Sequence, residues 1–323
     1  ASSSLLCRSI GQVLRPGLQP SQRAAEMITE VLDAPLSDSH PPVAELRGGA
    51  MGSSLHIMAT GDRNHVERLV AWASERVTEL EQLWSRFIPN SELSQLNANP
   101  GQSRVVSAET LALVQCAMEA RSLSGGRFDP TMLQAVCANG YDRTFVSIKT
   151  AVGLPALDTR RIGLGQITVD PATHTITLGE TTGFDPGGIG KGLAADMVAT
   201  EMIERGATGA LVNIGGDVRC IGHGPAAGNW IIAVGDAEAG VENRLVELGE
   251  GAIASSTSQR RRWTRQTDHG TESTHHLLEP STGRASTTAA RFVAVIAARC
   301  ADAEWLATAI AAESAMAVAN RGC

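Results

Sequence analysis

Apolar residues along the chain form a mixture of helical and strand-like patterns. In 65–84 they recur every three or four positions and end at Trp84, which predicts an amphipathic helix with one buried stripe. A second helix is expected over 108–122, since Gly125-Gly126 is a common signal after a helix C-terminus. Two further helices are expected over 189–205, which is entered through glycines, and over about 301–317.

Short apolar runs between these helices predict strands, over 56–59, 210–212, 230–234, 245–248 and 292–298. Helices and strands do not alternate in a regular βαβ rhythm. The pattern therefore predicts an α+β fold, with a largely antiparallel sheet packed by helices. Residues 1–45 are rich in Ser and Pro and are expected to form a poorly ordered tail, and 46–323 to form one domain.

Charge and aromatic content argue against a nucleic-acid ligand. The net charge is −7 and aromatic residues make up 3% of the chain, whereas nucleic-acid binders usually carry a basic surface and often stack bases on aromatic rings. One basic run departs from this composition, with Arg260, Arg261 and Arg262 followed by Arg265. It is either a solvated turn or a surface that faces phosphate.

The cysteines and the apolar segments further restrict the class of protein. The six cysteines are dispersed and form no C-x-x-C pair, which argues against a structural zinc site and against a disulfide scaffold. No apolar run approaches the roughly 18 residues of a membrane span. The apolar run near the N-terminus is too short for a secretory signal. We therefore expect a protein of the cytoplasm or of the membrane periphery.

Five short segments concentrate Gly, Asp, Asn, Ser and His between apolar runs, a composition typical of ligand-contacting loops. They are 87–97, 125–131, 184–196, 212–217 and 275–283. In 184–196, glycines at 187, 188, 190 and 192 precede or enter a helix, where free backbone N–H groups and the helix dipole favour an anion. Lys191 lies where it would meet a phosphate. Its segment indicates a diphosphate site, with close helix packing as the alternative.

The other segments each allow a structural and a functional interpretation. Asn90 and Ser91, with Glu92, either cap the next turn or contact a ligand. Asp129 offers acceptors to ribose or amide groups, or completes a plain turn. Asn213 and Asp217 flank a Gly-Gly bend at the end of a strand. His276, which stands before a rigid Glu-Pro turn, is either a structural histidine or a placed general base.

Taken together, the motifs resemble those of the FAD:protein FMN transferase (ApbE-type flavin transferase) family. The order and spacing agree from about residue 46 to about residue 316. The matching segments are Met51-Gly-Ser53, 90–97, 126–131, 185–196, 213–217, 276–283 and 303–308. Each motif alone indicates the family only weakly or moderately, whereas seven motifs in the same order indicate it specifically.

The resemblance implies an activity and a set of site residues. Family members bind FAD as a substrate, with a magnesium ion (Mg²⁺) bridging its diphosphate. They pass the FMN moiety to a Thr or Ser hydroxyl of an acceptor flavoprotein and release AMP. By position, the flavin-nucleotide contacts would be Met51, Phe87, Arg127, Phe128, Asp129, Asp185, Lys191 and Leu278. The metal would be held by the carbonyl of Gly188 and the side chains of Glu304 and Thr308, with His276 as the base.

The chain departs from the family pattern at three places. Glu304 stands where members usually carry Asp, Gly190 where they carry Ala, and Ala254-Ser-Ser-Thr257 where they carry Ala-Thr-Ser-Gly. Glu keeps a carboxylate for the metal, and the last difference bears on recognition of the acceptor. Three alternatives stay open: an FAD diphosphatase that uses water in place of the hydroxyl, a non-catalytic FAD-binding protein, and a metal-free interaction domain.

Overall fold

The computed structural model describes residues 41–148, 150–151, 165–226, 228–267, 270–287 and 290–313, and every structural statement below refers to these. Of the tail expected over 1–45, residues 1–40 lie outside the described residues, and the first strand begins at Val43. Among the helices of the described part, none combines the length and the apolar character that crossing a bilayer requires.

A six-stranded sheet, in the order β1-β2-β7-β8-β11-β16, forms the centre of the fold. Every neighbouring pair in it is antiparallel. The predicted α+β class with a largely antiparallel sheet is thereby confirmed. The strands are β1 (Val43–Ala50), β2 (Ser53–Thr60), β7 (Gly209–Ile214), β8 (Asp217–Gly222), β11 (Gly251–Thr257) and β16 (Phe292–Ala297).

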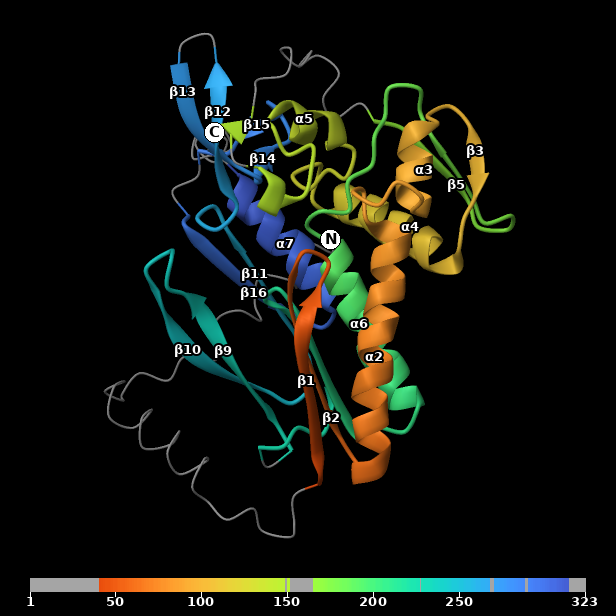
Figure 1. Ribbon diagram of the computed structural model, residues 1–323, viewed down its shortest axis with the longest axis vertical. Coiled ribbons are helices and arrows are strands. Elements are labelled where there is room, and N and C mark those ends of the chain that lie inside the picture. Colours follow the sequence, from red (N-terminus) through yellow and green to blue (C-terminus); the bar gives the residue numbers. More distant parts are fainter. Residues whose placement is uncertain are drawn as a thin grey trace, which may run out of the picture. The chain divides into compact units, whose positions relative to one another are not determined.

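Three helices cover one face of this sheet (Figure 1). Helix α2 packs on β1 and β2, α6 on β7 and β8, and α7 on β11 and β16. Alternate strand residues such as Ile57, Val212 and Ala252 point to this side and join the main core. The helices are α2 (Arg63–Trp84), α6 (Gly190–Glu204) and α7 (Cys300–Ala312).

A two-stranded hairpin packs against the opposite face of the sheet. It consists of β9 (Trp230–Asp236) and β10 (Val241–Leu248). Residues of the opposite alternation, including Leu211, Val218 and Ile253, form a second core with Trp230 and Ile232 of the hairpin. Both faces of the central strands are therefore buried, which explains their nearly continuous apolar runs.

The remaining elements surround the ends of the central sheet. Smaller sheets have the orders β3-β6-β5, β13-β12-β4 and β14-β15, and the β12–β4 pair is parallel. These elements are α3 (Glu92–Ala98), α4 (Ala108–Leu123), α5 (Leu133–Ala138), a 3₁₀ turn (Phe145–Ser147), β3 (Ser103–Val105), β4 (Thr150–Ala151), β5 (Ile167–Asp170), β6 (Thr175–Leu178), β12 (Arg262–Thr267), β13 (Gly270–His275), β14 (Leu278–Glu279) and β15 (Arg284–Ala285).

Helix boundaries follow the local sequence, with one correction. Helix α2 begins after Asp62, whose side chain accepts a hydrogen bond from the backbone N–H of His65 at 3.2 Å. Its buried residues are the predicted stripe. The prediction that the last helix continues to about 317 is wrong at Glu313, because that residue adopts an extended backbone (φ −73°, ψ 117°) and ends α7 at Ala312. Residues 314–317 lie outside the described part.

Close packing of α6 against the start of α7 positions the polar residues discussed below. A Cβ on Gly192 would lie 2.5 Å from the carbonyl oxygen of Cys300, so only glycine allows this approach. One turn later in α6, Asp196 accepts hydrogen bonds from the backbone N–H groups of Cys300 (2.8 Å) and Ala301 (2.9 Å). A carboxylate from one helix thus caps the N-terminus of the next.

Candidate functional site

The glycine-rich entry to α6 lies against the later part of α7. Gly188 has φ +89°, and a Cβ there would lie 2.8 Å from Thr308 Oγ1 and 3.2 Å from Phe128 Cε2. Glu304 precedes Thr308 by four residues, so both lie on one face of α7. The structure therefore brings the residues predicted to hold a metal, Gly188, Glu304 and Thr308, to one place beside Phe128.

Lys191 lies between two buried carboxylates. Its Nζ donates to Glu304 Oε1 at 2.7 Å and forms a short ion pair with Asp217. The other oxygen of Glu304 accepts from the backbone N–H of Gly192 at 2.7 Å. Burial alone would lower the pKa of Lys191, but the attraction of Asp217 and Glu304 outweighs it and raises the pKa above its ordinary value. Burial raises the pKa of Asp217 above its ordinary value, while the charge of Lys191 acts in the opposite direction.

Asp217 reaches this cluster through a tight turn between β7 and β8. Ile214 pairs with Asp217, and the two residues between them, Gly215 (φ +67°) and Gly216 (φ +101°), have positive φ, as a type I′ hairpin requires. Asn213 accepts from the N–H of Gly216 at 2.9 Å. The sequence signal, Gly-Gly-Asp after a strand, located this bend. It did not reveal the ion pair with Lys191, and Asp217 was missing from the expected site set.

His276, the predicted base, follows β13 in the chain. Burial lowers its pKa to about 3, and the charge of Arg261 acts in the same direction. The imidazole is therefore neutral near neutral pH, and its buried Nδ1 has no hydrogen-bond partner among the described residues. The neighbouring His275 is similar, since its Nδ1 also has no hydrogen-bond partner among the described residues while its Nε2 lies 3.0 Å from the carbonyl oxygen of Ser286. His276 thus keeps one ring nitrogen that no described residue contacts, and burial makes this nitrogen a weaker base than an exposed imidazole.

Two further predicted residues, Phe87 and Asp185, both contact the guanidinium of Arg86. The guanidinium of Arg86 lies over the rings of Phe87 (4.2 Å) and Tyr141 (4.7 Å) and 3.7 Å from Asp185 Oδ1. Predicted contact Leu278 packs with the cluster that includes Tyr141. Phe87, Asp185 and Leu278 were among the predicted residues, whereas Arg86 and Tyr141 were not, because the contact joins residues far apart in the sequence and leaves no local pattern.

Of the other predicted flavin contacts, Asp129 and Arg127 interact with side chains of the protein itself. Asp129 Oδ1 accepts from the N–H (2.8 Å) and hydroxyl (2.6 Å) of Thr131. Arg127 forms an ion pair with Glu313 at 3.4 Å. Met51 occupies the β1–β2 turn with φ +51°, an unusual conformation for a residue with a side chain. Such strain is typical of functional loops.

The oxygen donors between α7 and the entry to α6 suit a hard cation. The described residues contain no cluster of three or more His, Cys, Asp and Glu side chains placed to hold a metal ion. What they offer is a backbone carbonyl at Gly188, a hydroxyl at Thr308 and the carboxylates of Glu304 and Asp217. Mg²⁺ prefers such oxygen donors, with one or two carboxylates completed by substrate phosphates and water.

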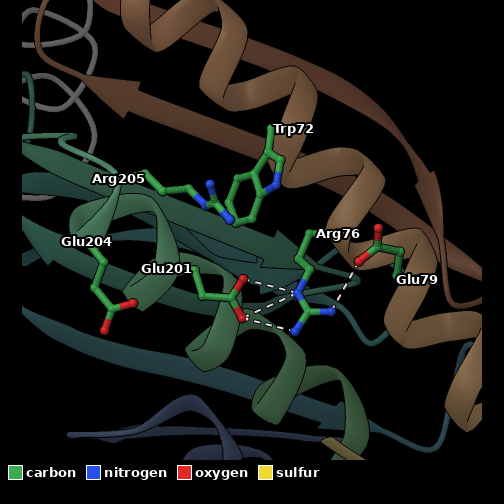
Figure 2. A pocket seen from close by; sticks show the side chains of 6 residues that line it. All are labelled: Trp72, Arg76, Glu79, Glu201, Glu204 and Arg205. Carbon is green, nitrogen blue, oxygen red and sulfur yellow. Dashed lines mark hydrogen bonds and ion pairs between the residues drawn. The ribbon is translucent and has the colours of Figure 1, made fainter.

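A hollow between α2 and α6 lies apart from these residues (Figure 2). It has a volume of about 650 Å³ and is lined by Trp72, Arg76, Glu79, Glu201, Glu204 and Arg205. Arg76 donates to Glu201 (3.0 Å), Glu109 (2.7 Å) and Glu79 (3.1 Å), while Arg205 stacks on Trp72 at 4.0 Å. These interactions already pair the cations with carboxylates or a ring, and none of the predicted site residues lines the hollow.

Fold and motifs together define a protein of the flavin transferase type. The model of the ApbE family matches residues 51–322, and the chain therefore belongs to the ApbE family. The family assignment made from the sequence motifs is confirmed.

Curated relatives and solved structures agree with this assignment. The FAD:protein FMN transferase of Treponema pallidum is 28% identical over 245 residues, which cover 71% of this chain and 67% of the relative. That of Vibrio cholerae is also 28% identical, over 75% of this chain and 73% of the relative. The ApbE protein of Thermotoga maritima superposes with a TM-score of 0.73 at 24% identity, covering 87% of this chain and 88% of that one. The flavin transferase ApbE of Vibrio cholerae gives 0.68 at 22%, covering 86% and 90%. At these identities the structural likeness shows the shared fold.

Proposed function

We propose that this chain is an FAD:protein FMN transferase that uses Mg²⁺ to move the FMN moiety of FAD onto a Thr or Ser hydroxyl of an acceptor flavoprotein, releasing AMP. The observation that carries the proposal is the 2.7 Å contact between Lys191 and Glu304 at the glycine-rich entry to α6. It joins the expected diphosphate contact to the expected metal ligand. The curated relatives named FAD:protein FMN transferase support the same activity.

Binding of FAD would rest on two neighbouring groups of residues. Around Gly188, the positive end of the α6 helix dipole and the charge of Lys191 would attract the diphosphate. Around Arg86, the rings of Phe87 and Tyr141 offer aromatic surface to a planar part of the nucleotide. The segment from Asp185 to Gly188 connects the two groups along the chain.

The chemical step needs charge neutralisation and in-line placement more than covalent help. The acceptor hydroxyl oxygen would form a bond to the phosphorus on the FMN side, and the bond from that phosphorus to the bridging oxygen would break. AMP would leave with the bridging oxygen, and the hydroxyl proton would pass to Nδ1 of His276. Mg²⁺, when bound by Gly188, Glu304 and Thr308, would neutralise diphosphate charge.

Turnover of FAD with and without an acceptor tests the proposal and separates it from the diphosphatase alternative. The protein would be incubated with FAD, Mg²⁺ and a candidate acceptor flavoprotein, and AMP and free FMN would be measured by chromatography. We expect AMP release to require the acceptor and free FMN to stay low. AMP and free FMN formed in equal amounts without any acceptor would instead establish a diphosphatase.

Flavin titration tests the diphosphate assignment separately. We expect the protein to bind FAD more tightly than FMN, as measured by fluorescence quenching. Lys191→Met should weaken FAD binding by about tenfold or more, the size of a lost charge-assisted hydrogen bond, and FMN binding by less. Arg205→Gln, in the remote hollow, is the control and should change neither. Equal affinity for the two flavins in the unaltered protein would contradict a diphosphate site at Lys191.

A further inference from the structure

The cluster around Lys191 carries an unbalanced charge. It holds two carboxylates, those of Asp217 and Glu304, against the single ammonium of Lys191. The two carboxylate side chains are 1% and 3% exposed, so solvent hardly reaches them. A buried negative charge without a counter-charge is unfavourable, so the cluster favours one further positive charge.

The oxygen atoms of the two carboxylates differ in how far they are already bonded. Glu304 uses Oε1 for Lys191 and Oε2 for the backbone N–H of Gly192, both at 2.7 Å. Asp217 uses only Oδ2, in its short ion pair with Lys191. Its Oδ1 is buried and has no hydrogen-bond partner in the described part of the chain. The backbone N–H of Ser255 lies near the Asp217 carboxylate and lowers its pKa, but its geometry does not meet that of a hydrogen bond to Oδ1.

We propose that Asp217 is a second carboxylate ligand of the divalent-cation site and binds the ion through Oδ1. The two carboxylates converge on one point, which the ammonium of Lys191 marks as a position for positive charge. Glu304 links this point to Thr308, one helical turn away on the same face of α7. The inference rests on the proposed function, and it adds a ligand to the expected set of Gly188, Glu304 and Thr308.

This ligand set has a definite consequence for charge. With Asp217 and Glu304 both on the ion, the bound divalent cation, Lys191 and the two carboxylates sum to one positive charge. A diphosphate then meets a positive cluster at the start of α6, whereas without the ion it would meet a negative one. The site should therefore take up the cation before, or together with, the nucleotide.

Binding of Mn²⁺, a spectroscopic substitute for Mg²⁺, tests the assignment without relying on turnover. The full chain would be titrated with Mn²⁺ in the presence of FAD, and free Mn²⁺ would be followed by electron paramagnetic resonance. We expect Asp217→Asn to weaken Mn²⁺ binding by at least about tenfold. The matched control is Asp236→Asn, which alters an equally buried carboxylate that pairs with Arg260 outside the site and should leave the Mn²⁺ affinity unchanged.

A measurement on the unaltered protein covers the case in which Asp217→Asn fails to fold. In crystals grown with FAD and Mn²⁺, the anomalous signal of manganese should lie within about 2.5 Å of Asp217 Oδ1. An ion held by Glu304 and Thr308 with Asp217 remote from it would overturn the inference and leave the proposed function standing. So would an Asp217→Asn variant that folds and binds Mn²⁺ as the unaltered protein does. Failure of the unaltered protein to bind Mn²⁺ with FAD would overturn the metal-dependent function itself.

Discussion

The contact between Gly192 and the start of α7 leaves no room for a side chain, so a single methyl group should disturb the site. Gly192→Ala would place a Cβ 2.5 Å from the oxygen and 2.6 Å from the carbon of the Cys300 carbonyl, and 2.8 Å from the nitrogen of Ala301. These are backbone atoms, so no side chain can turn away to make room. We expect the variant to push α7 away from α6 and to loosen the link between Lys191 and Glu304.

The expected loss of stability follows from three terms. Overpacking in a closely packed interior costs about 1–3 kcal/mol. Breaking one hydrogen bond between the Asp196 carboxylate and the N-terminus of α7 costs about 1.5–3 kcal/mol. Ala is better than Gly inside a helix by about 1 kcal/mol, which offsets part of this. The free energy of unfolding should therefore fall by about 1.5–5 kcal/mol.

Urea unfolding followed by circular dichroism measures this difference, and the chain supplies a matched control. Gly48 lies in β1, and a Cβ added there would have no atom within 4 Å, so Gly48→Ala should shift the free energy of unfolding by no more than about 1 kcal/mol. Gly192→Ala should also weaken FAD binding, because Lys191 and Glu304 separate. A Gly192→Ala protein as stable as Gly48→Ala would show that the packing of α6 on α7 does not require glycine at this position.

Three further predictions concern the site. His276→Asn should keep FAD binding but slow FMN transfer by about 10²-fold or more in a single-turnover assay, whereas His275→Asn should keep the rate. An unchanged rate in His276→Asn would return this histidine to a structural role. Because the folded pKa of His276 is about 3 and its ordinary value is 6.5, its contribution to stability is complete above about pH 6.5 and is lost as the pH falls toward 3. Unfolding free energies at several pH values should therefore depend less on acid in His276→Asn, and equal acid dependence in both proteins would contradict the assigned pKa. Glu304→Gln should abolish magnesium-dependent turnover, while Asp302→Asn, which removes an ion pair with Arg299 at 2.8 Å, should only lower stability by about 0.5–1 kcal/mol. Turnover of both variants would be measured against magnesium concentration. Loss of magnesium dependence in Asp302→Asn but not in Glu304→Gln would show that the register of α7 is misassigned.

Much of the fold was predictable because local patterns encode it. The apolar stripe of α2 repeats at the helical period, and all seven of its buried residues belong to that stripe. The end of α7 was not predictable in the same way. Apolar and small residues continue past Glu313 in the sequence, and no Gly or Pro stands at the point where the backbone becomes extended.

The candidate site was predictable where a motif stays within one segment. Gly188 and Lys191 share a glycine-rich helix entry, and Glu304 and Thr308 share one face of a helix, so each pair was visible as a spacing. The ion pair of Asp217 with Lys191 was not visible, because it joins residues 26 positions apart through the β7–β8 turn. Long-range pairing of this kind is set by sheet topology, which a single sequence does not display.

The intact mass of an acceptor flavoprotein decides whether this protein transfers FMN covalently. The acceptor would be incubated with FAD, Mg²⁺ and this protein, and then analysed by mass spectrometry after denaturation, with Glu304→Gln as the matched control. We expect a covalent adduct with the mass of FMN less water, located by fragmentation on a Thr or Ser side chain, in the unaltered reaction alone. An acceptor that stays unmodified while FAD is consumed, or an adduct that forms equally with Glu304→Gln, would contradict metal-dependent FMN transfer at this site.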